Sequence, residues 1–206
     1  KRLRKQGIRW LREPRWIQLA HDLAIVDFRL TVEWAAAELS FVSLEEWVNE
    51  SEFRSDGDTV AYSLTGRDGN VRREEKLVYP DGYFVLLDHQ RSAQGLLARA
   101  RFLLEVDNAT HPNRRFGKEK VAPGLAYIKS KAYEARFGDS SGRWLVVTTG
   151  ERRMRNLMRQ TRRVAGAGAQ VFLFTTFDQL TLGNLLTDQV WQQAGSQEPR
   201  ALLHGV

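Results

Sequence analysis

The chain has 206 residues, of which 42% are hydrophobic and 27% are charged, and its formal net charge is +6. This composition is typical of one globular domain with a core of its own. Cysteine is absent, which excludes disulfides and cysteine-ligated zinc and fits a reducing cytoplasm. No apolar run approaches the roughly 18 residues that a membrane span needs, so we expect no membrane partner.

The positive charge is concentrated in two blocks. Residues 1–15 hold seven Lys or Arg residues against one Glu, and residues 151–163 hold six Arg residues against one Glu. The rest of the chain is therefore net acidic. Two basic blocks on an acidic body favour a polyanionic partner, and DNA is the natural candidate. The alternative is that both blocks are solvated faces that keep the protein soluble.

Residues 1–18 form a basic N-terminal segment. It has a helix-like start, a stop at Gly7 and an apolar-basic stretch that reaches Pro14. This pattern resembles the end of a winged-helix module, in which a recognition helix runs into a wing. We expect the tail of a truncated module here, with sequence upstream because the first residue is not Met, and with DNA contacts from Arg2, Arg4 and Lys5.

A helix is predicted from about Ala20 to Leu39, because this stretch has no Gly or Pro and is followed by Ser40. The helical spacing assigns a core-facing stripe to five apolar residues: Leu23, Val26, Leu30, Trp34 and Ala37.

Three polar residues of this helix have two interpretations. From the residues alone, His21 and Asp22 cap the helix start and the acids are solvated. The family resemblances described below imply instead that His21 or Asp27 contributes to an active face, and they make Glu33 a further candidate for a place near a metal, although a solvated acid explains Glu33 better.

A first strand is predicted over residues 41–48, followed by a polar region with turn signals at Asp56-Gly57 and Asp68-Gly69-Asn70. The alternating stretch 59–64 between those turns predicts an inserted hairpin. Arg72, Arg73 and Lys76 follow it and either touch a nucleic-acid backbone or lie on the surface as ordinary side chains.

The most informative stretch is 77–110, where two β-rich runs carry carboxylates. Pro80-Asp81-Gly82 interrupts the first run, so Asp81 lies at a bend or strand start. Glu105 and Asp107 lie at the end of the second run and point to one face, because side chains alternate along a strand. If the strands are neighbours, all three acids converge on one hard cation such as Mg²⁺ or Mn²⁺.

The second half alternates helices and strands. A loop with Arg114 and Arg115, which we assign to DNA contact, leads into a helix over 118–137. The buried side of this helix holds Val121, Leu125, Ile128, Ala132 and Tyr133. A buried strand (143–149), a basic helix (151–165) and a second strand (170–175) predict parallel pairing through a right-handed crossover. A last helix is predicted over 178–194. Four arginines of the basic helix are assigned to DNA: Arg152, Arg153, Arg155 and Arg159.

The acidic motif resembles that of the PD-(D/E)XK nuclease superfamily, with Pro80-Asp81 followed by Glu105-Val106-Asp107. The order of elements is also similar. The resemblance implies a restriction-endonuclease-like mixed β-sheet flanked by helices, with Asp81, Glu105 and Asp107 as metal ligands. This sequence departs from the pattern at Asp107, which stands where the superfamily has its lysine. Lys120, in preference to Lys118 or Lys129, would supply that charge from a helix.

A narrower resemblance covers residues 21–177. His21-Asp22-Leu23, Val26-Asp27, the PDG and FLLEVDNAT strings and a helix with Lys and Tyr are together similar to the replication-relaxation proteins of plasmids and integrative elements. It implies a role in replication or mobilisation of such elements, and it adds His21 to the active face.

Other chemistries are disfavoured, because the chain has no phosphate loop, dinucleotide fingerprint, nucleophile elbow or histidine-rich zinc motif. We expect a nuclease-like domain over 19–195 and a flexible tail over 196–206. The first functional hypothesis is Mg²⁺- or Mn²⁺-dependent nicking or cleavage of DNA, with Asp81, Glu105, Asp107, Lys120 and His21 as the catalytic set. A DNA-binding initiator with an inactive nuclease fold is the second, and a protein-interaction module is the third. A homodimer or element-encoded partner proteins are left open.

Overall fold

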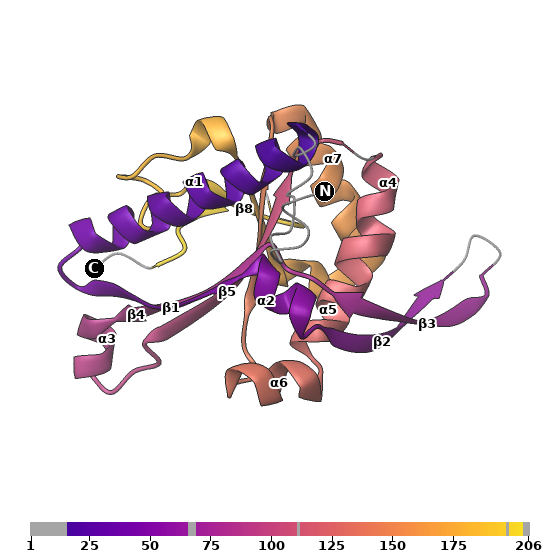
Figure 1. Cartoon of the computed structure of the whole chain (residues 1–206), viewed down its shortest axis with the longest axis horizontal. Coiled ribbons are helices and arrows are strands. Elements are labelled where there is room, and N and C mark those ends of the chain that lie inside the picture. Colours follow the sequence, from indigo (N-terminus) through magenta and orange to yellow (C-terminus); the bar gives the residue numbers. More distant parts are fainter. Residues whose placement is uncertain (1–15, 66–68, 111, 197, 204–206) are drawn as a thin grey trace, which may run out of the picture.

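The computed structural model describes residues 16–65, 69–110, 112–196 and 198–203, which form a mixed α/β fold (Figure 1). Within these residues one seven-stranded sheet has the order β1-β4-β5-β6-β7-β8-β9, and a second sheet pairs β2 with β3. The seven strands are β1 (Val42–Asn49), β4 (Gly82–Asp88), β5 (Arg99–Asp107), β6 (Arg143–Thr148), β7 (Phe172–Thr176), β8 (Trp191–Gln193) and β9 (Pro199–Arg200). The expected mixed sheet flanked by helices is confirmed. Arg2, Arg4 and Lys5, which the sequence assigned to DNA, lie outside the described residues.

Strand direction changes across the sheet. The pairs β1–β4 and β4–β5 are antiparallel, β5–β6 and β6–β7 are parallel, and β8 and β9 continue the far edge antiparallel. The predicted strand–helix–strand unit with parallel pairing is confirmed, because α7 (Glu151–Ala165) connects the parallel strands β6 and β7. Both strands are buried along almost their whole length, which explains their near-continuous apolar sequences.

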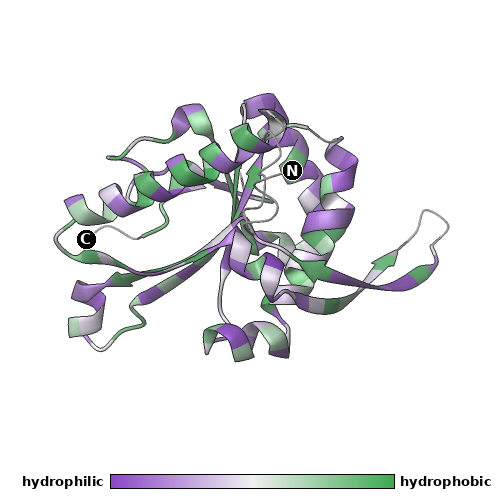
Figure 2. Ribbon diagram, viewed as in Figure 1, coloured by the Kyte–Doolittle hydropathy of each residue, from purple (hydrophilic) through white to green (hydrophobic). Residues whose placement is uncertain are grey.

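Helices cover both faces of the sheet (Figures 1 and 2). One face packs against α1 (Trp16–Glu38) and against apolar residues of the C-terminal region, with Phe84, Phe102 and Leu145 among the buried strand residues. The other face packs against the helices between β5 and β6 and against α7, around Tyr83, Leu103 and Val146. Successive strand residues therefore serve two different cores, as the alternation of side chains requires.

The predicted first helix is present, but its predicted core face is wrong. Trp34, Leu23 and Val26 are 55%, 52% and 49% exposed, and Leu30 and Ala37 are exposed as well. The buried residues of α1 are Phe28, Val32, Ala35 and Ala36. Apolar residues occur on several sides of α1, so the helical spacing of apolar residues did not identify the face that packs against the sheet. The small side chains of the two alanines face the sheet, while larger apolar residues remain outside.

The predicted inserted hairpin is confirmed. Strand β2 (Asp58–Thr65) pairs antiparallel with β3 (Val71–Val78), and we call this hairpin the β2–β3 arm. Helix α2 (Glu50–Ser55) precedes the arm and α3 (His89–Ala93) follows β4. The arm extends from the side of the molecule beyond α4 and α5 (Figure 1).

The single helix predicted over 118–137 is wrong. The chain forms α4 (Asn113–Phe116), a π-helix (Gly117–Val121), α5 (Ala122–Ile128) and α6 (Lys131–Phe137) in succession. Pro123 explains the first irregularity, because it has no N–H for the carbonyl of Glu119 four residues earlier. That carbonyl accepts a hydrogen bond from Lys76 Nζ at 2.8 Å instead. The break between α5 and α6 coincides with Ser130, which caps α6.

The last predicted helix is also wrong. Residues 166–171 and 177–179 form 3-10 turns, and Trp191 begins β8 within the stretch expected to be helical. Trp191 is fully buried, and its indole N–H donates to the Leu185 carbonyl at 2.9 Å, which ties the irregular segment down. In the stretch expected to be a flexible tail, β9 pairs with β8 and Leu202 and Leu203 are buried.

Candidate functional site

Asp81 and Glu105 are brought together by the pairing of β4 with β5. Gly82, at the start of β4, is opposite Leu104, and the Asp81 N–H donates to the Leu104 carbonyl at 2.9 Å. Asp81 Oδ2 accepts from the Val106 N–H at 2.6 Å. Both acids are buried, with 3% and 6% of their surface exposed. The expectation that the two acid-bearing strands are neighbours is therefore confirmed.

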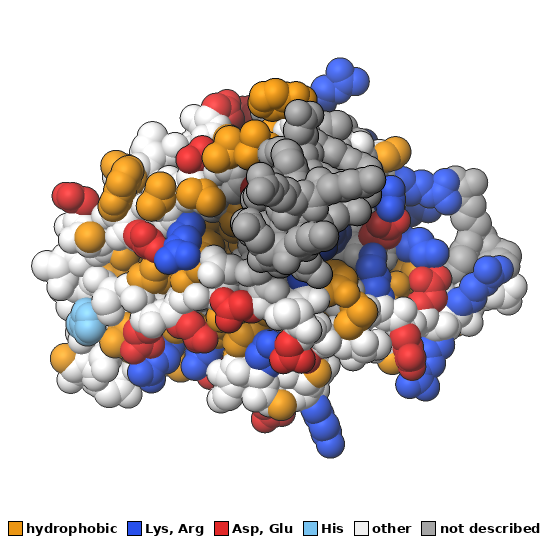
Figure 3. All heavy atoms as spheres, in the orientation of Figure 1, with side chains coloured by type: hydrophobic (Ala, Val, Ile, Leu, Met, Phe, Trp, Pro, Cys, Tyr) orange, Lys and Arg blue, Asp and Glu red, His pale blue; other side chains and the backbone are white. Residues whose placement is uncertain are grey.

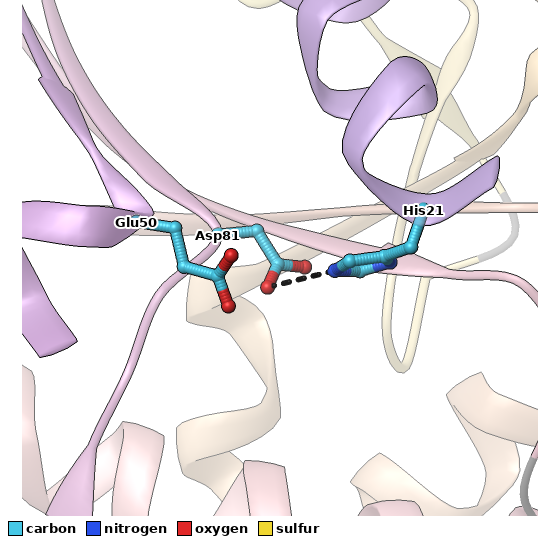
Figure 4. A group of neighbouring side chains, drawn as sticks. All are labelled: His21, Glu50 and Asp81. Carbon is cyan, nitrogen blue, oxygen red and sulfur yellow. Dashed lines mark ion pairs between the residues drawn. The ribbon is translucent and has the colours of Figure 1, made fainter. Parts of the chain in front are cut away.

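Two further side chains approach the Asp81 carboxylate from the starts of helices (Figure 4). His21 lies in the second turn of α1, and its Nε2 is 3.4 Å from Asp81 Oδ1. Glu50 is the first residue of α2, and Arg54 Nε donates to its Oε1 at 2.9 Å. One ligand atom from each of His21, Glu50 and Asp81 lies within 4.8 Å of the other two. One nitrogen and two carboxylates at this spacing can surround a single cation.

Lys120 reaches the site from the π-helix. Its Nζ is 2.6 Å from Glu105 Oε2, and although 40% of the side chain is exposed, its ammonium group contacts the buried carboxylate. The two other lysines considered from the sequence are elsewhere: Lys118 pairs with Glu74 at 3.2 Å, and Lys129 is exposed. Lys120 is thus the lysine that the fold places beside the acids.

Burial and neighbouring charges shift three pKa values here. Burial raises the pKa of Glu105; Lys120 opposes this shift and the Asp81 carboxylate adds to it. Burial opposes the charge of Lys120, but Glu105 and Asp81 outweigh it and raise the pKa of Lys120. A hydrogen bond to Asp81 raises the pKa of His21 despite partial burial. The raised pKa values show that the carboxylates of this cluster favour protonation or a nearby positive charge.

Asp107 is engaged in a different interaction. Arg153 binds it with two nitrogens, Nε to Oδ2 and Nη2 to Oδ1, both at 2.8 Å, and Thr148 Oγ1 donates to it at 2.7 Å. Arg153 also donates to the side chain of Asn113. The structure therefore places Asp107 in a largely buried ion pair that joins β5 to α7, and it places Arg153 there as well, although the sequence assigned Arg153 to DNA.

The acidic cluster lines a pocket of about 470 Å³. Its walls come from α1, α2, the β3–β4 connection, the end of β5 and the π-helix. All five residues of the expected catalytic set contribute to the lining, which comprises Gln18, His21, Glu50, Arg54, Tyr79, Asp81, Glu105, Val106, Asp107, Asn108, Thr110 and Lys120. Segments that are far apart in sequence thus form one polar cavity.

The other arginines assigned to DNA lie on exposed surfaces. Arg114 and Arg115 are on α4, and Arg152, Arg155 and Arg159 are on α7, where Arg155 pairs with Glu151. Lys and Arg side chains gather in the region of the β2–β3 arm and α4 (Figure 3).

Sequence reasoning missed Glu50, and the helix glutamate that it considered was Glu33, for which a solvated acid was the better explanation. Glu33 is held by Arg29 on the same helix, with Nε and Oε1 2.7 Å apart, and it does not line the pocket. A signal for Glu50 was available, because Asn49, a typical N-cap residue, separates it from the predicted strand and Ser51 and Glu52 follow it in a polar stretch typical of a helix start. Its approach to Asp81 is a long-range contact that local patterns do not contain.

Comparison with known proteins gives one match. The family model described as Replication-relaxation matches residues 1–139 of the 206-residue chain. No curated protein and no solved structure matches the chain. Within the described residues, no helix combines the length and apolar character that crossing a membrane requires.

Proposed function

The chain belongs to the replication-relaxation family, whose role concerns the replication or relaxation of plasmids or mobile elements and implies interaction with DNA. We propose that the pocket around Asp81 and Glu105 nicks or cleaves DNA in a metal-dependent reaction. The observation that carries the proposal is the convergence of two buried carboxylates from neighbouring strands with Lys120, whose Nζ is 2.6 Å from Glu105. Phosphodiester hydrolysis needs anionic metal ligands and a cation near the phosphate, and these residues supply both.

The residues fit a divalent metal ion. His21, Glu50 and Asp81 would hold it, and the buried, negatively charged surroundings would strengthen its binding. Mn²⁺ suits this set better than Mg²⁺, because imidazole is a good ligand for transition metals while Mg²⁺ prefers oxygen. When bound, the ion lowers the pKa of its water and stabilises charge on the scissile phosphate. In this proposal the cation would share Asp81 with the set expected from the sequence, and His21 and Glu50 would take the places of Glu105 and Asp107.

The surrounding residues have separate tasks in this proposal. Lys120 neutralises charge that develops on the phosphate, and Glu105 orients Lys120 through their ion pair. Arg54 holds Glu50 toward the pocket. Asp107 and Arg153 fix the end of β5 against α7 and contact no substrate.

A restriction-endonuclease-like core is part of the proposal. Three features support it: the antiparallel strands β1, β4 and β5, the helices that lead to the parallel strand β6, and the acids at the start of β4 and the end of β5. The β2–β3 arm is then an insertion before β4.

A second candidate function is DNA binding without cleavage. Asp107 stands where the resemblance expects a lysine and is engaged by Arg153. The Glu105 carboxylate is likewise paired with Lys120. A nuclease fold whose acids serve internal ion pairs would bind DNA as an initiator or accessory factor.

The deciding experiment measures nicking of a supercoiled plasmid that carries the element's origin region, with Mn²⁺ or Mg²⁺. We expect wild type to nick and Glu50→Gln and Asp81→Asn to lose at least about 100-fold in rate, because each removes a charged ligand. Glu33→Gln, a matched change on α1 outside the pocket, should retain full activity. Titration of Mn²⁺ by calorimetry should show weaker binding only for the two pocket variants. Absence of nicking by wild type, with DNA binding intact, would favour the second candidate.

A further inference from the structure

The base of the β2–β3 arm is firmly held by the body of the protein. Asp58 Oδ2 accepts from Tyr127 of α5 and from Arg136 Nε of α6, both at 2.6 Å. Val60 and Val78 are buried in the core beneath the arm. Lys118 of the π-helix pairs with Glu74 at 3.2 Å. The proximal half of the arm is therefore fixed in direction relative to the pocket.

The distal half has a different character. Val71 is 67% exposed, and Arg72 and Arg73 are exposed on opposite faces of the ribbon, as alternation along β3 requires. Within the described part of the chain, neither arginine forms an ion pair or hydrogen bond through its side chain. The distal strands thus present two positive charges to solvent, although Arg72 is close enough to Glu74 to add to the lowering of its pKa by Lys118.

The arm is also directly connected to the acidic pocket. Strand β3 ends at Val78, Tyr79 lines the pocket, and Asp81 follows two residues later. At about 3.3 Å per residue, the eight residues from Arg73 to Asp81 span at most about 26 Å. One turn of B-form DNA measures about 34 Å, so a duplex with one phosphate at the pocket passes the distal arm less than a turn away.

We propose that the β2–β3 arm inserts into a groove of duplex DNA, with Arg72 and Arg73 contacting the backbone or base edges at its walls. This inference rests on the proposed function for the position of the DNA at the pocket. A two-stranded ribbon has the dimensions that the major groove admits. Single-stranded DNA is disfavoured, because proteins bind it through exposed aromatic side chains and residues 63–73 contain none.

The test compares two double variants that each remove two positive charges. Arg72→Ala/Arg73→Ala alters the arm, and Lys129→Ala/Lys131→Ala alters two exposed residues near the start of α6. Binding to a fluorescent 20-base-pair duplex is measured by anisotropy between about 50 and 200 mM salt, with chelator present so that no metal chemistry intervenes. We expect the slope of log affinity against log salt to decrease in magnitude by about 2 for the arm variant only, since each lost phosphate contact contributes about 0.9. Circular dichroism confirms that both variants are folded.

Three results would overturn the proposal. They are equal effects of the two double variants, an arm variant that binds duplex like wild type, and a larger loss for the single strand of the same sequence than for the duplex. Because the assay involves no cleavage, loss of salt dependence in the arm variant supports the arm even where the nuclease proposal fails. If the arm variant binds duplex DNA like wild type and still cuts it at the normal rate, the nuclease proposal stands and the arm proposal fails.

Discussion

At the scale of single residues, the ion pair between Asp107 and Arg153 gives the clearest prediction. Only 11% and 14% of their side-chain surfaces are exposed, and the guanidinium binds both carboxylate oxygens. Arg153→Met should destabilise the protein by about 3 kcal/mol, because it leaves a buried carboxylate without its partner. The free energy of unfolding in urea measures this change.

The double variant Arg153→Met/Asp107→Leu is the control for the same pair. It should recover most of the loss, since replacing both members of a buried pair by apolar residues is often neutral. Asp107→Asn should leave Mn²⁺ affinity unchanged, whereas a large loss of affinity would return Asp107 to the metal site.

The pH dependence of stability tests His21. Its hydrogen bond to Asp81 raises the pKa of His21 above the ordinary value of 6.5. A raised pKa in the folded state stabilises the fold below about pH 6.5, and this contribution is lost as the pH rises through the folded-state value. In chelator, the difference in unfolding free energy between wild type and His21→Asn should therefore be larger at pH 5.5 than at pH 9. A difference that grows with pH would contradict the assignment.

At the same scale, the sequence located part of the site. Asp81 and Glu105 were predictable because Pro80 marks a strand start and the apolar run before Glu105 marks a buried strand end. Glu50 was not, because its place beside Asp81 depends on how α2 packs against the sheet. The partner of Asp107 was not predictable either, since Arg153 lies 46 residues further along the chain.

At the scale of elements, α5 lies unusually close to the sheet. A Cβ atom on Gly124 would lie 3.1 Å from Trp144 Nε1, and that nitrogen donates to the Gly124 carbonyl at 3.0 Å. Gly124→Ala should cost about 1–3 kcal/mol of stability, because the added methyl group pushes the helix away from β6. Thermal or urea unfolding measures the loss. A Cβ atom on Gly183 would have no other atom within 4 Å, so Gly183→Ala should be close to neutral. Equal losses of stability in the two variants would show that the contact between Gly124 and Trp144 does not cause the loss.

The orientation of α1 gives another comparison between matched substitutions. Val32 is fully buried, whereas Leu30 on the same helix is 36% exposed. Val32→Ala should destabilise the protein by about 2 kcal/mol and Leu30→Ala by less than about 1 kcal/mol, although leucine loses more atoms. Urea unfolding of both variants checks the order. The opposite order would restore the core stripe predicted from periodicity.

Helices and strands with one clear hydrophobic pattern were predictable from the sequence, whereas elements with an ambiguous pattern were not. The strands of the central sheet, the inserted hairpin and the β6–α7–β7 crossover follow from apolar runs, turn residues and one amphipathic pattern. The face of α1 was ambiguous because apolar residues occur around much of the helix. The π-helix and the segment around Trp191 depend on tertiary contacts that local sequence does not encode.

At the scale of the whole molecule, an exposed apolar row and most of the exposed basic residues lie on different elements, although the arm and α7 also expose Val71, Leu77 and Val164. Exposed basic residues lie on the arm, α4 and α7, while Leu23, Val26, Leu30 and Trp34 form an exposed apolar row along α1 (Figure 3). Raising the salt concentration should weaken DNA binding, because the basic surfaces bind phosphates electrostatically. The apolar row carries no charge and should contribute nothing to this salt dependence. Overall composition gave the positive charge and the globular class, but only the fold shows which elements carry the exposed basic and apolar residues.

The π-helix determines the rotational phase of the helical segment that carries Lys120. Each residue of an α-helix advances by about 100°, so one additional residue in a turn rotates the following segment by that amount relative to the preceding one. Deleting Lys118 would convert the wide turn between Phe116 and Ala122 into an ordinary one and turn α4 about 100° relative to Lys120 and α5. Lys120 follows the deleted position and would stay beside Glu105, whereas Arg114 and Arg115 on α4 would point in other directions. The number of residues between α4 and Pro123 therefore determines how the arginines of α4 are oriented relative to the site.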